Sequence, residues 1–335
     1  MKRVVTFGEV MLRLSPPAYS RFSQASTFDR TFGGAELNVA VSLAQLGVPS
    51  AFVTKLPEND VAEACVIEMR GLGVGTAHVR RGGERIGVYY VERGAAQRAS
   101  TVIYDRKNSA IAETDPAEWD WRTILGGATA LHVTGITPAL SEHCRIATRD
   151  ALTAAREAGV TTFFDLNYRQ KLWSTKEAGK VLAELLPLAT YGVVSDHDAE
   201  TLFDIRSKKT CPEKKQAEVA EKLTKRFGLT GVAMTRREQH SASRNGWGGM
   251  FCVGGTAHVS RQYEIDFIVD RVGGGDAFTA GIIYGVVTEK KPQDTVEFAA
   301  AASCLKHSIA GDFNLVSVAE VEALVAGDGS GRVRR

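Results

Sequence analysis

The sequence predicts an α/β protein with a central, mostly parallel sheet that is covered by helices on both faces. Apolar stretches with strand character alternate along the 335 residues with stretches that have helical spacing, and glycines follow the helical stretches. Strands that alternate with helices of this length imply crossover connections and therefore parallel pairing. We expect one domain over residues 1–326 and a disordered tail over 327–335.

The expected elements follow one another in a regular order. Strands are expected at residues 4–11, 50–55, 130–134, 160–166, 191–194 and 231–235. Helices are expected at residues 36–46, 62–72, 142–158 and 213–227, each closed by a glycine at 47, 73, 159 or 228. Two stretches, at about 12–30 and 86–107, have strand character without crossover helices between them. They predict a small separate sheet.

Bulk composition excludes several classes of function. Lys and Arg number 41 against 39 for Asp and Glu, so the chain lacks the basic surplus of a nucleic-acid-binding protein. The five cysteines are scattered without paired spacing, which indicates neither a disulfide framework nor a zinc site. The longest apolar run, residues 277–287, is too short to span a membrane, and no signal peptide is expected. These features predict a cytoplasmic protein.

Residues 270–278 carry the strongest indication of chemistry. Three glycines, Gly273, Gly274 and Gly275, precede Asp276 at the start of an apolar helix. Glycines let backbone amides crowd around an anion, and a helix N-terminus adds partial positive charge there. Asp276 would then be placed to take a proton from an attacking hydroxyl. The alternative for this stretch alone is an ordinary glycine-rich turn with an aspartate near a helix start.

Two signatures together resemble those of the ribokinase-like (PfkB-type) carbohydrate kinases. Residues 270–278 fit Asp-x-x-Gly-x-Gly-Asp-Ala-Phe, and residues 33–40 read Gly-Gly-Ala-Glu-Leu-Asn-Val-Ala. The resemblance implies the ribokinase-like fold, with the small sheet as a lid over the sugar and as a contact in a homo-oligomer, a dimer or higher. It also implies ATP and Mg²⁺ as cofactors and leaves a monovalent cation open.

The N-terminal signature provides candidate sugar-binding residues. Gly33 and Gly34 would allow a substrate to approach the backbone closely, because no Cβ intervenes. Asn38, about one turn into the following helix, could donate to and accept from a sugar hydroxyl. Without the resemblance, a glycine hinge and a surface asparagine would explain these residues equally well.

Residues 165–169, Asp-Leu-Asn-Tyr-Arg, follow a predicted strand at the sheet edge where α/β proteins bind ligands. The resemblance implies that Asn167 faces the phosphates and that Arg169 faces an acidic group of the substrate. Asp165 and Asn167 could instead simply cap a turn.

Arg106 and Arg169, with Tyr89 and Tyr104 on the lid, resemble the arrangement in 2-keto-3-deoxygluconate kinases. An arginine can bind a carboxylate through two parallel hydrogen bonds, and a neutral sugar would leave such a desolvated charge unpaired. The alternatives are that both arginines are exposed, or that they bind ATP phosphates.

The resemblance also implies nucleotide contacts from Asn167, Ser195, Thr235, Gly273, Gly275, His307 and Gly311. His307 taken alone is more typical of a packed or solvated histidine. The usual Asn-x-x-Glu motif near the metal reads Ser195-Asp196-His197-Asp198 here, so Asp198 or Glu200 would act on Mg²⁺, directly or through water. Residues 236–240, Arg-Arg-Glu-Gln-His, stand where many relatives have a glycine-rich nucleotide loop.

The reaction implied is transfer of the γ-phosphoryl group of ATP to the 6-hydroxyl of 2-keto-3-deoxygluconate. Asp276 would accept the hydroxyl proton, and the amides of Gly273, Gly274 and Gly275 would hold the developing charge. Other sugars stay open, among them fructose, another ketohexose or the galacto epimer of the acid. A silent sugar- or nucleotide-binding regulator is the alternative from another class, and the intact Asp276 counts against it.

Overall fold

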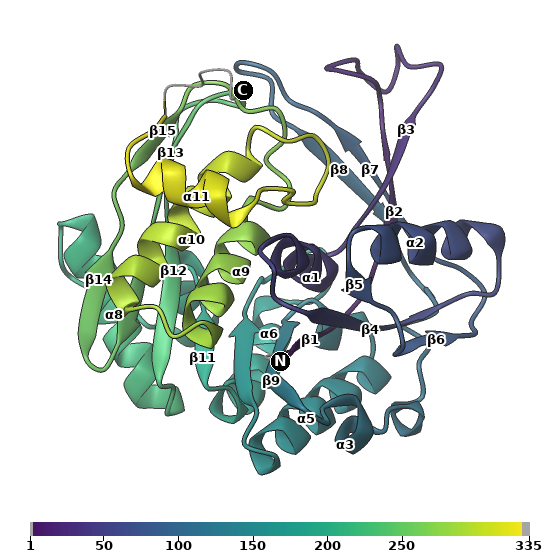
Figure 1. Cartoon of the computed structure of the whole chain (residues 1–335), viewed down its shortest axis with the longest axis horizontal. Coiled ribbons are helices and arrows are strands. Elements are labelled where there is room, and N and C mark those ends of the chain that lie inside the picture. The colour runs from purple at the N-terminus through teal and green to yellow at the C-terminus, as the bar shows by residue number, and fades with distance from the viewer. Residues whose placement is uncertain (1–2, 330–335) are drawn as a thin grey trace.

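A sheet of eleven strands forms the centre of the protein, which is represented by a computed structural model that describes residues 3–329 (Figure 1). Its main path runs β14-β13-β12-β11-β10-β9-β1-β4-β5, with β15 beside β13 and β6 beside β4. The neighbours from β12 to β5 pair in parallel, whereas β13 pairs with β12 in antiparallel register. The strands are β1 (Arg3–Phe7), β4 (Ser50–Leu56), β5 (Val74–Gly75), β6 (Val79–Arg81), β9 (Ala128–Thr134), β10 (Thr161–Asp165), β11 (Tyr191–Val193), β12 (Gly231–Gln239), β13 (Asn245–Val253), β14 (Thr256–Val259) and β15 (Tyr263–Ile265).

Helices cover both faces of this sheet, because alternate strand residues belong to different apolar cores. Val5 and Phe164 pack with α5, α6 and α8, whereas Val4 and Phe163 pack with α1, α9 and α10. Buried residues on both faces are expected for a parallel sheet. The helices are α1 (Ala35–Gln45), α2 (Asp60–Gly71), α3 (Trp121–Ile124), α4 (Thr137–Leu140), α5 (Glu142–Glu157), α6 (Thr175–Leu185), α7 (Asp196–Phe203), α8 (Pro212–Phe227), α9 (Gly274–Val287), α10 (Pro292–Lys306) and α11 (Val318–Val325).

The small second sheet, called the lid below, has the strand order β3-β2-β7-β8 (Figure 1). Its strands are β2 (Met11–Ser15), β3 (Asp29–Gly33), β7 (Gly87–Glu92) and β8 (Thr101–Asp105). The predicted α/β class and the predicted separate sheet are both confirmed. The single strand expected at residues 4–11 is wrong, because β1 ends at Phe7 and Met11 begins the lid. A Cβ at Gly8, between them, would lie 2.3 Å from the Glu36 carboxyl group, so this break needs glycine.

The end of the chain falls partly outside the described residues. Of the expected disordered tail, residues 330–335 are not described, whereas the amide of Asp328 donates to the carbonyl of Ala323 over 2.9 Å. Within residues 3–329, no helix has the length and apolar character needed to cross a bilayer.

Candidate active site

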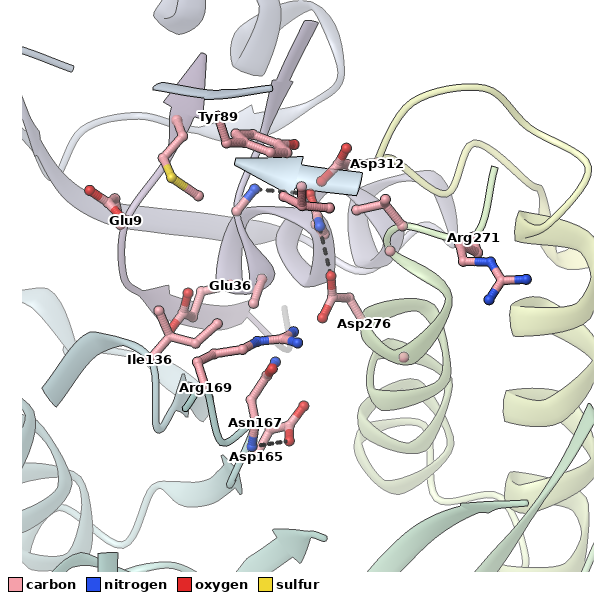
Figure 2. A pocket seen from close by; sticks show the side chains of 18 of the residues that line it. Glu9, Glu36, Tyr89, Ile136, Asp165, Asn167, Arg169, Arg271, Asp276 and Asp312 are labelled. Carbon is pink, nitrogen blue, oxygen red and sulfur yellow. Dashed lines mark hydrogen bonds between the residues drawn. The ribbon is translucent and has the colours of Figure 1, made fainter. Parts of the chain in front are cut away.

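A cavity of about 400 Å³ lies between the lid and the carboxyl edge of the central sheet (Figure 2). Thirteen of the predicted site residues line it together: Gly34, Asn38, Tyr89, Tyr104, Arg106, Asn167, Arg169, Ser195, Asp198, Thr235, Gly273, Gly275 and Asp276. These residues belong to both sheets, to helices α1, α7 and α9 and to the loops beside them, and only the fold brings them to one cavity. Gly33, Gly274, Glu200, His307 and Gly311 are not part of its wall.

Asp276 lies in the first turn of α9 and points into the cavity (Figure 2). The side-chain amide of Asn38 donates to its Oδ2 over 2.6 Å, so helices α1 and α9 meet at this carboxylate. Burial raises the pKa of Asp276 to about 6, although the Asn38 bond and Arg169 oppose the shift. At pH 7 this group is mostly ionised and close to the pKa that suits a general base.

The three glycines before Asp276 differ in what they contact. Gly273 has φ 84°, and a Cβ there would lie 2.0 Å from the carbonyl oxygen of Asp312. Gly274 is buried, and a Cβ there would lie 2.7 Å from the His307 ring. Gly275 faces open space, and its amide belongs to the first turn of α9, where amides have no partner one turn earlier in the helix. Gly275 is therefore the glycine best placed to offer its amide to an anion.

The N-terminal glycines are packed rather than hinge-like. A Cβ at Gly34 would lie 2.0 Å from the carbonyl oxygen of Glu9, and one at Gly33 would lie 2.5 Å from the Tyr89 hydroxyl. Asn38 is 3% exposed, so it is not a surface asparagine. These two glycines let the lid, the first loop and α1 approach one another closely.

Asp165 and Asn167 form a turn at the end of β10. The Asn167 amide donates to Asp165 Oδ1 over 3.1 Å, and Asn167 adopts φ 38°, a left-handed conformation that asparagine tolerates. Asp165 therefore caps this turn, as the simpler interpretation held, while Asn167 and Arg169 also line the cavity. Figure 2 shows the Arg169 guanidinium pointing toward Asp276. Burial, and then Asp276 and Asp198, raise the pKa of Asp165 to about 8.

Arg106 is held by a carboxylate that the sequence did not single out. Its Nε donates to Oε2 of Glu9 over 2.7 Å, its Nη2 contacts the same oxygen, and Ser109 donates to Oε1 over 2.5 Å. Both Arg106 and Glu9 line the cavity, and Arg106 is 8% exposed, so it is not a surface residue. Glu9 follows β1 at the carboxyl edge of the sheet, a position that could have pointed to it.

A second buried arginine connects the lid to the segment just before residues 273–275, which we call the glycine loop. Arg13, on β2, donates to Asp270 over 2.5 Å and to Asp312 over 2.6 Å, and its side chain is 2% exposed. Asp270 also accepts from the amides of Val272 and Gly311. Gly311, with φ 83°, thus shapes the turn that supports this network. No motif pointed to Arg13, although its partner Asp270 is the first residue of the C-terminal signature.

Glu36 is a further buried carboxylate of the cavity wall that sequence reasoning did not assign. It accepts from the amide and hydroxyl of Thr134 and from the hydroxyl of Thr137, and burial raises its pKa. Because it belongs to the quoted N-terminal signature, the motif itself was the available signal. It fixes the start of α1 against the end of β9.

Three acidic residues of the cavity wall are available to a divalent cation through its bound waters. Asp165, Asp198 and Asp276 line the cavity together, and burial raises the pKa of each. Carboxylate oxygens are the ligands that Mg²⁺ prefers, and a cation would relieve the cost of burying these charges. Glu200, in contrast, is exposed and forms an ion pair with Arg206 at 3.4 Å.

The predicted nucleotide contacts divide into two groups. Thr235 lines the cavity, as does Ser195, whose hydroxyl caps α7 by accepting from the Asp198 amide. His307 is 1% exposed, its Nδ1 lies 2.7 Å from the carbonyl oxygen of Ser303, and it packs against Trp247. Burial lowers the pKa of His307 to about 4. Its position supports the alternative of a packed histidine beneath the glycine loop.

Comparison with known proteins decides the family. A family model described as pfkB family carbohydrate kinase matches residues 1–313. This chain belongs to that family. A crystal structure of 2-dehydro-3-deoxygluconokinase from Thermotoga maritima is similar to this pfkB-family kinase with a TM-score of 0.95 and 45% identity, covering 98% of this chain and 100% of that one. The predicted ribokinase-like fold is thereby confirmed.

Two curated relatives of this kinase are sugar-acid kinases by name. The chain is 35% identical over 329 residues to a 2-dehydro-3-deoxygalactonokinase from Haloferax volcanii, covering 98% of each chain. It is 29% identical to a 2-dehydro-3-deoxygluconokinase from Bacillus subtilis, covering 92% of this chain and 91% of the relative. The two names differ in the epimer of the acid, so they leave the sugar substrate of this chain open.

Proposed function

We propose that this kinase transfers the γ-phosphoryl group of ATP to the 6-hydroxyl of 2-keto-3-deoxygluconate. The observation that carries the proposal is the Arg169 guanidinium, which lines the same cavity as Asp276. Among residues 3–329, no carboxylate lies within salt-bridge distance of it. Arg169 is exposed, as one alternative held, so its guanidinium is free to form two parallel hydrogen bonds with a sugar carboxylate that enters the cavity.

Each step of the proposed reaction has a residue in the cavity. The sugar 6-hydroxyl attacks the γ-phosphorus, Asp276 takes its proton, and the bond from the γ-phosphorus to the departing ADP oxygen breaks. The Gly275 amide and the N-terminus of α9 stabilise negative charge on the transferred group. Asp165 and Asp198 would hold Mg²⁺, which neutralises phosphate charge when bound.

The galacto epimer, 2-keto-3-deoxygalactonate, is the second candidate substrate, because the Haloferax volcanii relative carries that name. The two acids share the carboxylate and the 6-hydroxyl, so Arg169 and Asp276 would serve both. Rates of ADP release with both epimers, fructose and ribose test the proposal. We expect sugar acids to exceed neutral sugars by orders of magnitude, with one epimer preferred. Equal efficiency on fructose would refute the assignment, and nucleotide binding without turnover on any sugar would favour the regulator.

We propose further that a second copy covers the outer face of the lid. Alternate residues of the lid strands face the cavity, whereas Leu12, Val88, Tyr90 and Ile103 stand opposite them, half-exposed or exposed. A contiguous apolar face of this kind is costly in water. Light scattering should show a dimer or larger assembly that Ile103→Glu disrupts, and a monomeric native chain would refute this proposal.

A further inference from the structure

Two further arginines, Arg237 and Arg271, line the cavity wall. Arg237 lies near the end of β12, and Arg271 comes two residues before Gly273. Figure 2 shows Arg271 on the far side of the glycine loop from Arg169. Nη2 of Arg271 donates to the carbonyls of Ser241, over 3.1 Å, and Ala242, over 2.7 Å, which anchors the side chain without neutralising it.

The neighbouring Arg236, on the same strand, is paired with a carboxylate. It forms an ion pair with Glu213 of α8 at 3.0 Å. Successive strand residues point to opposite faces, so Arg236 faces α8 and Arg237 faces the cavity. Within the described chain, neither Arg237 nor Arg271 has a carboxylate at salt-bridge distance.

The positive charges of Arg237 and Arg271 are not neutralised by an ion pair among the described residues. Burial and the proximity of Arg271 lower the pKa of Arg237, and both arginines contribute to lowering the pKa of His307. Asp270 is the acidic residue that acts on Arg271, but Arg13 already holds its carboxylate. Arg237 is exposed and Arg271 is half-buried, so their like charges meet at the open edge of the cavity, where an anion between or beside them would relieve the repulsion.

We propose that Arg237 and Arg271 form a clamp for the polyphosphate of the nucleotide. This rests on the proposed kinase activity, and it adds two residues to which no role has been assigned. Guanidinium groups bind phosphate oxygens through parallel donors, and these two stand beside the loop whose amides face the transferred group.

Direct binding measurements on the full chain test the clamp without requiring turnover. Calorimetric titration with ATP, AMP and adenosine would compare the native chain with Arg237→Met, Arg271→Met and the matched control Arg236→Met. We expect each clamp variant to weaken ATP about 10-fold or more, AMP less, and adenosine not at all. The control should bind all three ligands as the native chain does. The Michaelis constant for the sugar acid should not change in any variant.

Several outcomes would overturn the proposal. Equal losses for ATP and adenosine would mean that the arginines support the fold, and thermal melting would confirm it. If the variants changed only the Michaelis constant for the sugar acid, the two arginines would bind that substrate instead. If Arg236→Met lost as much affinity for ATP as the clamp variants, the effect would be one of general surface charge. The clamp variants could lose affinity for ATP but not for adenosine while the native chain phosphorylates no sugar acid. That result would support the clamp and refute only the proposed function.

Discussion

Two groups of arginines around the cavity differ in whether the protein itself neutralises their charge. Arg13, on the lid, and Arg106, just after it, are buried and paired with Asp270, Asp312 and Glu9. On the side of the glycine loop, Arg237 lines the cavity without an ion pair among the residues described, and Arg271 is held by backbone carbonyls. Paired charges fix geometry before a ligand arrives, whereas unpaired charges supply attraction that only an anion can satisfy.

Arg169 differs from the lid arginines in being exposed. It lies on the turn after β10, and its charge acts on Asp165, Asp198 and Asp276 at a distance. Arg13 and Arg106 therefore position the carboxylates that they bind, whereas Arg169 has no such partner among the residues described. Variants at Asp276, at these arginines and at the glycines can test that distinction.

The largest effect is expected from Asp276→Asn. Asparagine keeps the shape of the side chain but cannot take the hydroxyl proton, so kcat should fall by about 10²–10⁴-fold. Sugar-acid affinity, measured by calorimetry, should change much less. A variant that keeps most of its turnover would remove Asp276 from the role of base.

Arg169→Met should weaken the sugar acid by roughly 10- to 150-fold, because a charge-assisted hydrogen bond contributes about 1.5–3 kcal/mol. Its free energy of unfolding should stay near that of the native protein.

Arg106→Met should instead destabilise the fold by about 3–5 kcal/mol, because Glu9 would stay buried without its partner. Denaturant unfolding with and without Glu9→Gln checks this, since the second change should restore part of the loss. Equal stabilities for the two arginine variants would contradict the contrast between paired and free charges.

Activity should decrease at acidic pH, because the proposed base Asp276 has a raised pKa. Burial raises the pKa of Asp276 to about 6, so the base is ionised above that pH and protonated below it. The value of kcat/KM should therefore fall about tenfold for each pH unit below 6. An acid limb near pH 4, the ordinary range of an aspartate, would show that Asp276 is not the titrating base.

Substitutions in the glycine loop should have the smallest effect. They distinguish a glycine that is needed for packing from one that is needed for catalysis. Gly275→Ala places its methyl group in open space beside the anion site, so turnover should drop several-fold with little change in melting temperature. Gly274→Ala forces a methyl group against the His307 ring and should lower the melting temperature instead. The reverse pattern would mean that Gly274 serves the anion and Gly275 only the turn.

The sequence by itself determined the fold class, the separate lid sheet and thirteen residues of the cavity wall. Strand and helix periods are local properties, and the two signatures keep their chemistry within a few residues, so both can be read along the chain. That is why Asn38, Asn167, Arg169 and Asp276 were all expected before the structure placed them in one cavity.

Only the tertiary structure decided which charges are already satisfied. Arg13 lies 257 positions from Asp270 and Arg106 lies 97 from Glu9, and no periodicity links residues so far apart. Burial likewise decided that His307 packs and that Glu200 faces solvent. Pairing and desolvation depend on what surrounds a side chain in space, so the difference between a positioning arginine and a ligand-binding one appears only once the chain is folded.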